Sequence, residues 1–203
     1  MIFEEKNTNM EWMFSGKADV GDYVVIPYWE MACSELMFNG EKVEIPFRNI
    51  QETKLYCIKN EGGKCELMFD NALFPMAIAP FKTDKEICFK NSLLRKYLKK
   101  CFVPAFKHAM KLPDDLKIKC DLLTSSEVFG DNCLDWFKEP KHRIAMYKET
   151  SEWWWLGDEY GDCEGDASSS YFCFVHYSGT AYLTHAGNAD YYVRPRFVIG
   201  AKA

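Results

Sequence analysis

The hydrophobic pattern changes its period twice along the chain, and this order of segments constrains the possible fold most strongly. Residues 1–90 are mainly strand-like. Residues 22–28 are rich in β-branched and aromatic side chains, which favour extended backbone. Residues 53–59 and 64–70 flank Glu61-Gly62-Gly63, and two β-prone runs around such a turn predict a hairpin.

Residues 91–140 form the helical part of the chain. Asn91 and Ser92 are typical of a helix N-cap, because such side chains accept a hydrogen bond from the free N–H groups of the first turn. Apolar side chains follow at helical spacing, at Leu93, Leu94, Tyr97 and Leu98. Pro104 either ends this helix or begins a second one, because proline lacks the N–H that a helix interior needs.

The rest of the chain returns to strands. Leu122 and Leu123 predict a short buried strand, and Thr124-Ser125-Ser126-Glu127 has the capping-box spacing of a short helix that continues through Val128. Aromatic and small residues with glycine turns indicate strands and loops over 150–200. Strands, helices and strands in this order predict an α+β fold, with mixed or antiparallel strands and two or three short helices. No linker rich in Pro, Gly or Ser divides the chain, so we expect a single domain over 1–203.

Charge and hydropathy argue against two classes of partner. The net charge is -5, whereas nucleic-acid-binding proteins usually carry a basic surface, so we expect no nucleic-acid partner. The one basic stretch fits the solvated face of a helix; it contains Arg95, Lys96, Lys99 and Lys100. No run of about 18 apolar residues occurs, so we expect a soluble protein without membrane insertion.

The cysteines bear on the compartment in which the protein is made. Nine is a high and odd number for 203 residues, and no pair has the C-x-x-C spacing of zinc or redox motifs. Residues 1–10 lack the apolar core of a secretory signal peptide. We therefore expect synthesis in the cytoplasm, with reduced and separated thiols. Virion proteins need no signal peptide, so association with a phage particle stays open.

Motifs of common enzyme classes are missing. The chain has no H-E-x-x-H, G-x-S-x-G or G-x-G-x-x-G, and Gly63-Lys64 lacks the first glycine of a P-loop. The four histidines have no recognisable ligand spacing, although His176 and His185 could serve as metal ligands. We expect a protein without catalytic activity, cofactor or bound metal.

An acidic run in the C-terminal part is similar to the start of a calcium-binding loop. Asp162, Glu164 and Asp166 alternate like the first three ligands of an EF-hand. Ala167 stands where the sixth position requires glycine, and Cys173 stands where the twelfth requires glutamate. We interpret the run as a solvated acidic loop, and an irregular calcium site stays open.

Residues 157–192 have a biased composition. They contain no Lys, Arg, Met, Gln or Trp, but six of the chain's 11 tyrosines. Tyrosine with serine, glycine and asparagine is typical of antibody paratopes, because tyrosine supplies rigid amphipathic area while small polar residues adapt. The same residues are reachable from an asparagine codon whose adenines are replaced. Hairpin turns with β-prone tyrosines produce a similar composition, so both explanations stay open.

Because side chains alternate between the two faces of a strand, the biased segment predicts a binding surface on one face. We expect one solvent-exposed face formed by Asp158, Tyr160, Ser170, Tyr171, His176, Tyr177, Tyr182, His185, Asn188, Asp190 and Tyr191. Apolar side chains should point the opposite way, at Phe172 or Phe174, Val175, Leu183 and Val193. Within the run Trp153-Trp154-Trp155, Trp154 or Trp155 should belong to the core and another ring should face a ligand.

Four segments resemble an uncharacterised domain family of gut bacteria and their phages. They are residues 91–98, residues 122–128, Trp154-Trp155-Leu156 and Val193-Arg194-Pro195-Arg196-Phe197. The last two are similar to the family's WWLRS block and closing VRP strand, except that Gly157-Asp158 replaces Arg-Ser. The resemblance implies a C-type-lectin-like fold. From the residues themselves we expect Arg194, which precedes a proline, to be buried and hydrogen-bonded.

With the biased segment, the chain also resembles the variable proteins of diversity-generating retroelements. That resemblance implies a phage or bacterial binding protein whose ligand is a protein or carbohydrate on a cell surface. One alternative is an enzyme related to the formylglycine-generating oxidases, which would use Cys163 and Cys173. Another is a calcium-dependent carbohydrate lectin, although Glu139-Pro140 continues to Lys141 and not to the asparagine of the sugar motif.

Overall fold

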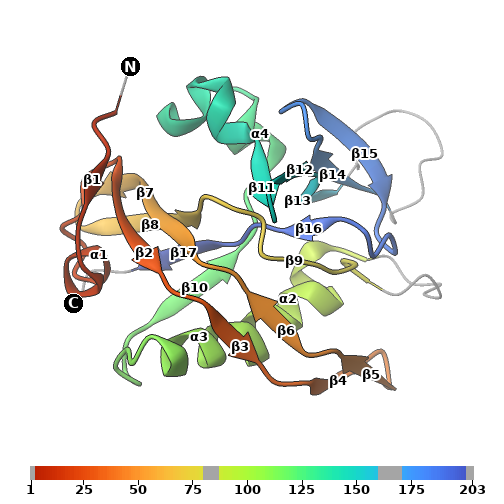
Figure 1. The fold of residues 1–203 in the computed structure, drawn as a ribbon. Helices are drawn as coiled ribbons and strands as arrows, with labels where there is room; N and C mark the ends of the chain where they lie inside the picture. The colour runs from red at the N-terminus through yellow and green to blue at the C-terminus, as the bar shows by residue number, and fades with distance from the viewer. Residues whose placement is uncertain (1–2, 80–86, 160–170, 200–203) are drawn as a thin grey trace.

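The computed structural model describes residues 3–79, 87–159 and 171–199. In spatial order, the first sheet contains β1 (Lys6–Asn7), β2 (Asp22–Ile26), β7 (Thr53–Glu61), β8 (Lys64–Phe69), β17 (Arg196–Ile199) and β10 (Ile118–Asp121). The second sheet contains β15 (Ala181–His185), β14 (Tyr171–Val175), β13 (Trp154–Glu159), β16 (Tyr192–Val193) and β9 (Phe74–Pro75). Figure 1 shows the two sheets on opposite sides of the view.

Short strand pairs and helices complete the fold. The pairs are β3 (Trp29–Met31) with β6 (Arg48–Ile50), β4 (Ser34–Phe38) with β5 (Glu41–Ile45), and β11 (Ala145–Tyr147) with β12 (Thr150–Glu152). The helical segments are α1 (Met10–Phe14), η1 (Phe89–Asn91), α2 (Leu93–Tyr97), η2 (Leu98–Phe102), α3 (Val103–Ala109), α4 (Ser125–Val128), η3 (Asp135–Lys138) and η4 (Pro140–Arg143). The β1–β2 and β13–β16 pairs are parallel and the other described pairs are antiparallel. The predicted α+β class with mixed strands is confirmed.

Local sequence signals explain several element boundaries. The β7–β8 hairpin turns at Gly62 and Gly63, whose φ angles are +60° and +80°. Positive φ at both central residues is what a tight hairpin turn requires, and glycine supplies it without strain. β2 ends at Ile26, two residues before the predicted end, since Pro27 has no N–H for the ladder.

The helical part follows the expected caps. The Ser92 Oγ accepts a hydrogen bond from the Arg95 N–H at 3.0 Å, and Leu94 and Leu98 are fully buried as predicted. α2, η2 and α3 follow one another without interruption, and Pro104 lies in the first turn of α3. η2 is a π-helical turn placed directly before that proline.

The α4 region confirms one prediction and corrects another. The Thr124 side chain accepts from the Glu127 N–H at 3.3 Å, and the Glu127 carboxylate accepts from the Thr124 N–H at 2.8 Å, which is the predicted capping box. Leu122 and Leu123 are buried, but strand β10 has already ended at Asp121. The Leu123 carbonyl instead accepts from the Gly157 N–H at 2.7 Å and ties this segment to β13.

Two apolar clusters lie on opposite faces of shared strands. In β7, Leu55 and Cys57 belong to the first cluster, whereas Tyr56 belongs to the second. In β13, Trp155 belongs to the first and Trp154 to the second. This alternation follows from the two-residue period of a strand. The clusters are therefore not independent cores, because the same strands separate and support both.

The cysteines in the described part of the chain are free thiols. Burial raises the pKa of the Cys120 thiol, so this sulfur is unreactive. Cys57 and Cys65 are not separated as expected, because their sulfurs lie 3.5 Å and 3.7 Å from the same Ala18 carbonyl oxygen. The β7–β8 register brings them together, and spacing along the chain does not reveal it. Among the described residues, no helix has the length and apolar composition needed to cross a membrane.

Candidate ligand-binding surface

The hairpin between β14 and β15 places a tyrosine at its tip. The Gly179 N–H donates to the His176 carbonyl at 2.8 Å, and the His176 N–H donates to the Thr180 carbonyl at 2.8 Å. Gly179 has φ +81°, and its Cα faces the Arg143 and Ile144 side chains of the η4 segment. The turn therefore packs against residues 140–144, while Tyr177 within it is 49% exposed.

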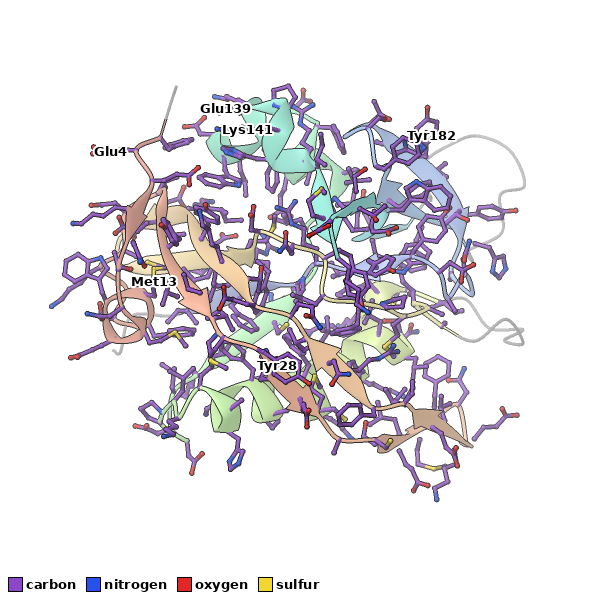
Figure 2. The ribbon with its side chains drawn as sticks, viewed as in Figure 1. Glu4, Met13, Tyr28, Glu139, Lys141 and Tyr182 are labelled. Carbon is purple, nitrogen blue, oxygen red and sulfur yellow. The ribbon has the colours of Figure 1, made fainter. Side chains whose placement is uncertain are left out.

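Four rings form a continuous patch beside this turn, which we call the aromatic surface: Trp153, His176, Tyr177 and Tyr182. The His176 ring centroid lies 3.8 Å from that of Tyr177 and 5.3 Å from that of Tyr182. Trp153 is nearly parallel to His176 and Tyr177, at 5.9 Å and 6.4 Å between centroids. Tyr182 is 55% exposed, and Figure 2 shows it at the outer side of the second sheet.

Buried rings hold the aromatic surface in place. Phe174 stacks against Tyr182 at 6.0 Å between centroids. Tyr191 lies 4.5 Å from Phe174 and 5.1 Å from Trp153. The His176 Nδ1 is also hydrogen-bonded to the Ser178 Oγ at 2.8 Å. Because these contacts restrict the rings before any ligand arrives, binding loses less conformational entropy.

The other two tryptophans of the run belong to the core, as predicted for at least one of them. Trp154 and Trp155 are fully buried, whereas Trp153 is half-buried. The Trp154 Nε1–H donates to the Arg143 carbonyl at 2.9 Å, and the Trp155 Nε1–H donates to the Met76 carbonyl at 2.8 Å. Both indole groups are thus satisfied inside the protein.

Arg194 lies directly behind this core. Its guanidinium donates to the Phe69 and His142 carbonyls at 2.9 Å each and lies 5.0 Å from the centroid of the Trp154 ring. Burial lowers the pKa of Arg194 to about 10, so the group is still charged at neutral pH. The prediction of a buried, hydrogen-bonded arginine is confirmed.

A groove of about 340 Å³, which we call the acidic groove, opens next to the aromatic surface. Its lining includes Trp153 and Tyr177 together with Glu152, Asp190 and Tyr192. Burial raises the pKa of Glu152. Burial is also the largest cause of the raised pKa of Tyr192, and the charges of Glu152 and Asp190 add to it. The charges of both carboxylates therefore raise the pKa of the same group, the Tyr192 hydroxyl.

The structure brings together part of the predicted surface. His176, Tyr177 and Tyr182 lie on one face, and Asp190 is exposed and lines the acidic groove beside Tyr177. Phe172, Phe174, Val175 and Val193 are buried. Phe172 and Phe174 nevertheless share the face of Tyr182, with Phe174 stacked beneath it, so the expectation that one of them points the opposite way is wrong. Tyr160 and Ser170 lie outside the described residues.

Tyr171 and His185 lie on the opposite face of the β14–β15 ladder. They pair across the strands, with their rings 5.8 Å apart, and Tyr171 is 41% exposed. Leu183 shares this face and so points away from Tyr182 as expected, but it is 39% exposed and does not belong to the core. Strand alternation holds, and in the described part of this ladder both faces carry exposed side chains.

Three further predicted residues have structural contacts. Tyr191 is 6% exposed, because its ring packs on Trp155 at 4.8 Å, so its predicted exposure is wrong. Asp158 is half-buried and accepts from the Ser125 N–H at 2.8 Å and from the Ser125 hydroxyl, so it anchors α4 and does not join the exposed face. The Asn188 Oδ1 accepts from the Asp190 N–H at 3.1 Å and shapes the turn before β16.

The sequence interpretation missed Glu152 and Tyr192 as groove residues. Glu152 stands directly before the tryptophan run, and Tyr192 directly after Tyr191. Glu152 is the last residue of β12, and Tyr192 is the first residue of β16. The parallel Trp154–Tyr192 pairing that brings them together has no local signal.

The described residues contain no group of three His, Cys, Asp or Glu side chains that could hold a metal. The acidic run with Asp162, Glu164 and Asp166 lies outside them, as does Cys163. Cys173 is half-buried against the second apolar cluster. Comparisons with models of protein families, with characterised proteins and with solved structures found no match.

Proposed function

We propose that this chain is a non-enzymatic binding protein that recognises a ligand on a cell surface through the aromatic surface. The observation that carries the proposal is the exposure of Tyr177 and Tyr182 above a floor of buried rings. Exposed tyrosines on a rigid support are typical of binding sites, since they add contact area at low entropic cost.

We further propose that the fold is C-type-lectin-like and that the surface belongs to the variable proteins of diversity-generating retroelements. The support is the resemblance of the Trp154-Trp155-Leu156 and Val193-Arg194-Pro195 segments, together with the exposure of part of the biased segment. Tyr191 fits the other explanation, in which a tyrosine of this segment is ordinary core.

Binding of the labelled protein to a panel of intact gut-bacterial cells, measured by flow cytometry, tests the function. We expect binding to some strains, reduced at least tenfold by the double substitution Tyr177→Ala and Tyr182→Ala. Thermal unfolding should show little loss of stability, because exposed substitutions usually cost within about 0.5 kcal/mol each.

Tyr28→Ala is the matched control, because Tyr28 is 49% exposed and Figure 2 shows it away from Tyr182. Cell binding that survives the double substitution, or that falls equally with Tyr28→Ala, would contradict the proposed surface.

Sequencing of the neighbouring DNA tests the proposed diversification separately. We expect a near-copy of the 154–197 coding segment that differs at adenines, beside a reverse transcriptase gene. The differing codons should include His176, Tyr177 and Tyr182 and should spare the buried Tyr191. Differences spread evenly over exposed and buried positions would contradict the idea.

A further inference from the structure

The acidic groove combines two carboxylates with aromatic rings, and the described residues that line it include no basic side chain. Glu152 and Asp190 supply the charges, and Trp153, Tyr177 and Tyr192 supply the rings. Within the described part of the chain, neither carboxylate forms an ion pair. The described residues therefore provide negative charge at this place without a paired counter-charge.

Nearby basic groups do not fill the groove. The Lys148 Nζ lies 5.3 Å from the centroid of the Tyr147 ring, and that ring lies 4.7 Å from Tyr192. Lys148 thus contacts Tyr147, and it is not among the described residues that line the groove. His176 contacts Tyr177 but is hydrogen-bonded to Ser178.

Electrostatics favours a cationic occupant over a neutral one. Two like charges in one groove repel each other, and a neutral ligand that displaces their water leaves both uncompensated. A cation offsets both charges and gains attraction from the faces of the neighbouring rings. The core of the same protein contains such a ring–cation pair, since the Arg194 guanidinium lies 5.0 Å from the Trp154 ring centroid.

We propose that the acidic groove binds the side chain of a lysine or arginine on a protein partner. This inference rests on the proposed function, because it names the chemistry that is recognised beside the aromatic surface. The groove volume of about 340 Å³ accommodates one such side chain. The shared residues Trp153 and Tyr177 make the groove and the aromatic surface one continuous footprint.

The test uses the full chain and a fluorescent tetralysine peptide, with anisotropy as the readout at low salt. The groove variant is Glu152→Gln with Asp190→Asn. The control variant is Glu41→Gln with Glu44→Gln, which removes the same charge from the exposed strand β5. Circular dichroism confirms that both variants are folded.

We expect the groove variant to bind tetralysine at least tenfold more weakly than the unmodified chain, and the control variant to remain within twofold. Acetylation of the peptide's lysine side chains should also weaken binding at least tenfold, because it removes their charge. Equal binding by the two variants, equal binding of the acetylated peptide, or no binding by the unmodified chain would each overturn the inference.

Cell binding separates the two proposals. If the groove variant binds cells normally while the Tyr177 and Tyr182 double variant does not, the inference fails and the proposed function stands. If the tyrosine variant also binds cells normally, the proposed function fails whatever the peptide result.

Discussion

Two regions of this protein place charged groups beside aromatic rings, and they differ in the partners that these charged groups have. Arg194, Pro195 and Arg196 form the junction that carries the chain from β16 to β17. There Arg194 meets a tryptophan ring and two carbonyls, and Arg196 donates to Glu66 at 2.8 Å and to Glu127. In the acidic groove, Glu152 and Asp190 lie beside similar rings, and none of residues 3–79, 87–159 and 171–199 pairs a cation with them.

The difference separates charges that serve the fold from charges that are available to a ligand. At the junction, removing a charged side chain leaves buried partners unsatisfied, so the free energy of unfolding should fall. In the groove, removing a charge relieves burial and repulsion and should cost the fold nothing. Stability and binding should therefore respond in opposite ways in the two regions.

The largest expected effect comes from the ring at the junction. Trp154→Ala removes a fully buried ring and its hydrogen bond to Arg143, and should lower the free energy of unfolding by about 3–5 kcal/mol. Trp155→Ala should cost a similar amount. Urea unfolding should show a much smaller loss for Trp153→Ala, because Trp153 is half-buried. Equal losses at all three tryptophans would remove the distinction between core and surface.

Arg194→Met should give the next largest loss. The substitution keeps most of the side-chain volume but orphans the Phe69 and His142 carbonyls, at about 1–3 kcal/mol for each. Urea unfolding measures the effect. Arg143→Met would be a poor control, because Arg143 is half-buried and also donates to a carbonyl. Lys100→Met, at an exposed side chain of η2, serves better. A stable Arg194→Met variant would show that the junction does not depend on the charge.

Glu127 should make the stability of the junction depend on pH. Burial acts to raise its pKa, but the Arg196 charge and the hydrogen bonds from Arg196 and Thr124 outweigh burial, so the pKa is lowered. A carboxylate whose pKa is lowered by folding stabilises the protein above its unfolded pKa of about 4.3, and this stabilisation is lost as the pH falls through the folded value. Glu127→Gln should therefore cost about 1–2 kcal/mol at pH 7 and much less at pH 3. If Glu127→Gln lowered the free energy of unfolding equally at both pH values, the effect would come from altered packing and not from the lost charge.

The sequence predicted those elements whose signals are local. Ser92, the Thr124 capping box and the Gly62-Gly63 turn were all assigned correctly, because caps and tight turns depend on residues within three or four positions. Alternation along one strand predicted that Trp154 or Trp155 belongs to the core, and the structure buries both.

The site was predicted only in part, because alternation separates two faces but does not say what covers them. His176, Tyr177 and Tyr182 were placed correctly on one face. Asp158 was misplaced because its partner Ser125 lies 33 positions away. Tyr191 was misplaced because its ring packs on Trp155, which comes from another strand. Long-range pairing of this kind has no signature in a single sequence.

The smallest expected effect has the opposite sign and tests the acidic groove directly. Burial raises the pKa of Glu152 in the folded chain, so the ionised carboxylate destabilises the fold above that pKa, and the penalty disappears as the pH falls through it. Glu152→Gln should therefore leave stability unchanged or slightly raised at pH 7, with no gain at pH 3. Thermal unfolding at the two pH values checks the sign, and Glu41→Gln, at an exposed position of β5, is the matched control. A clear loss at pH 7 would mean that Glu152 has a stabilising partner in the folded chain. The charge of the groove would then already be paired within the protein, as at the junction. The groove could then no longer be inferred to bind a basic ligand.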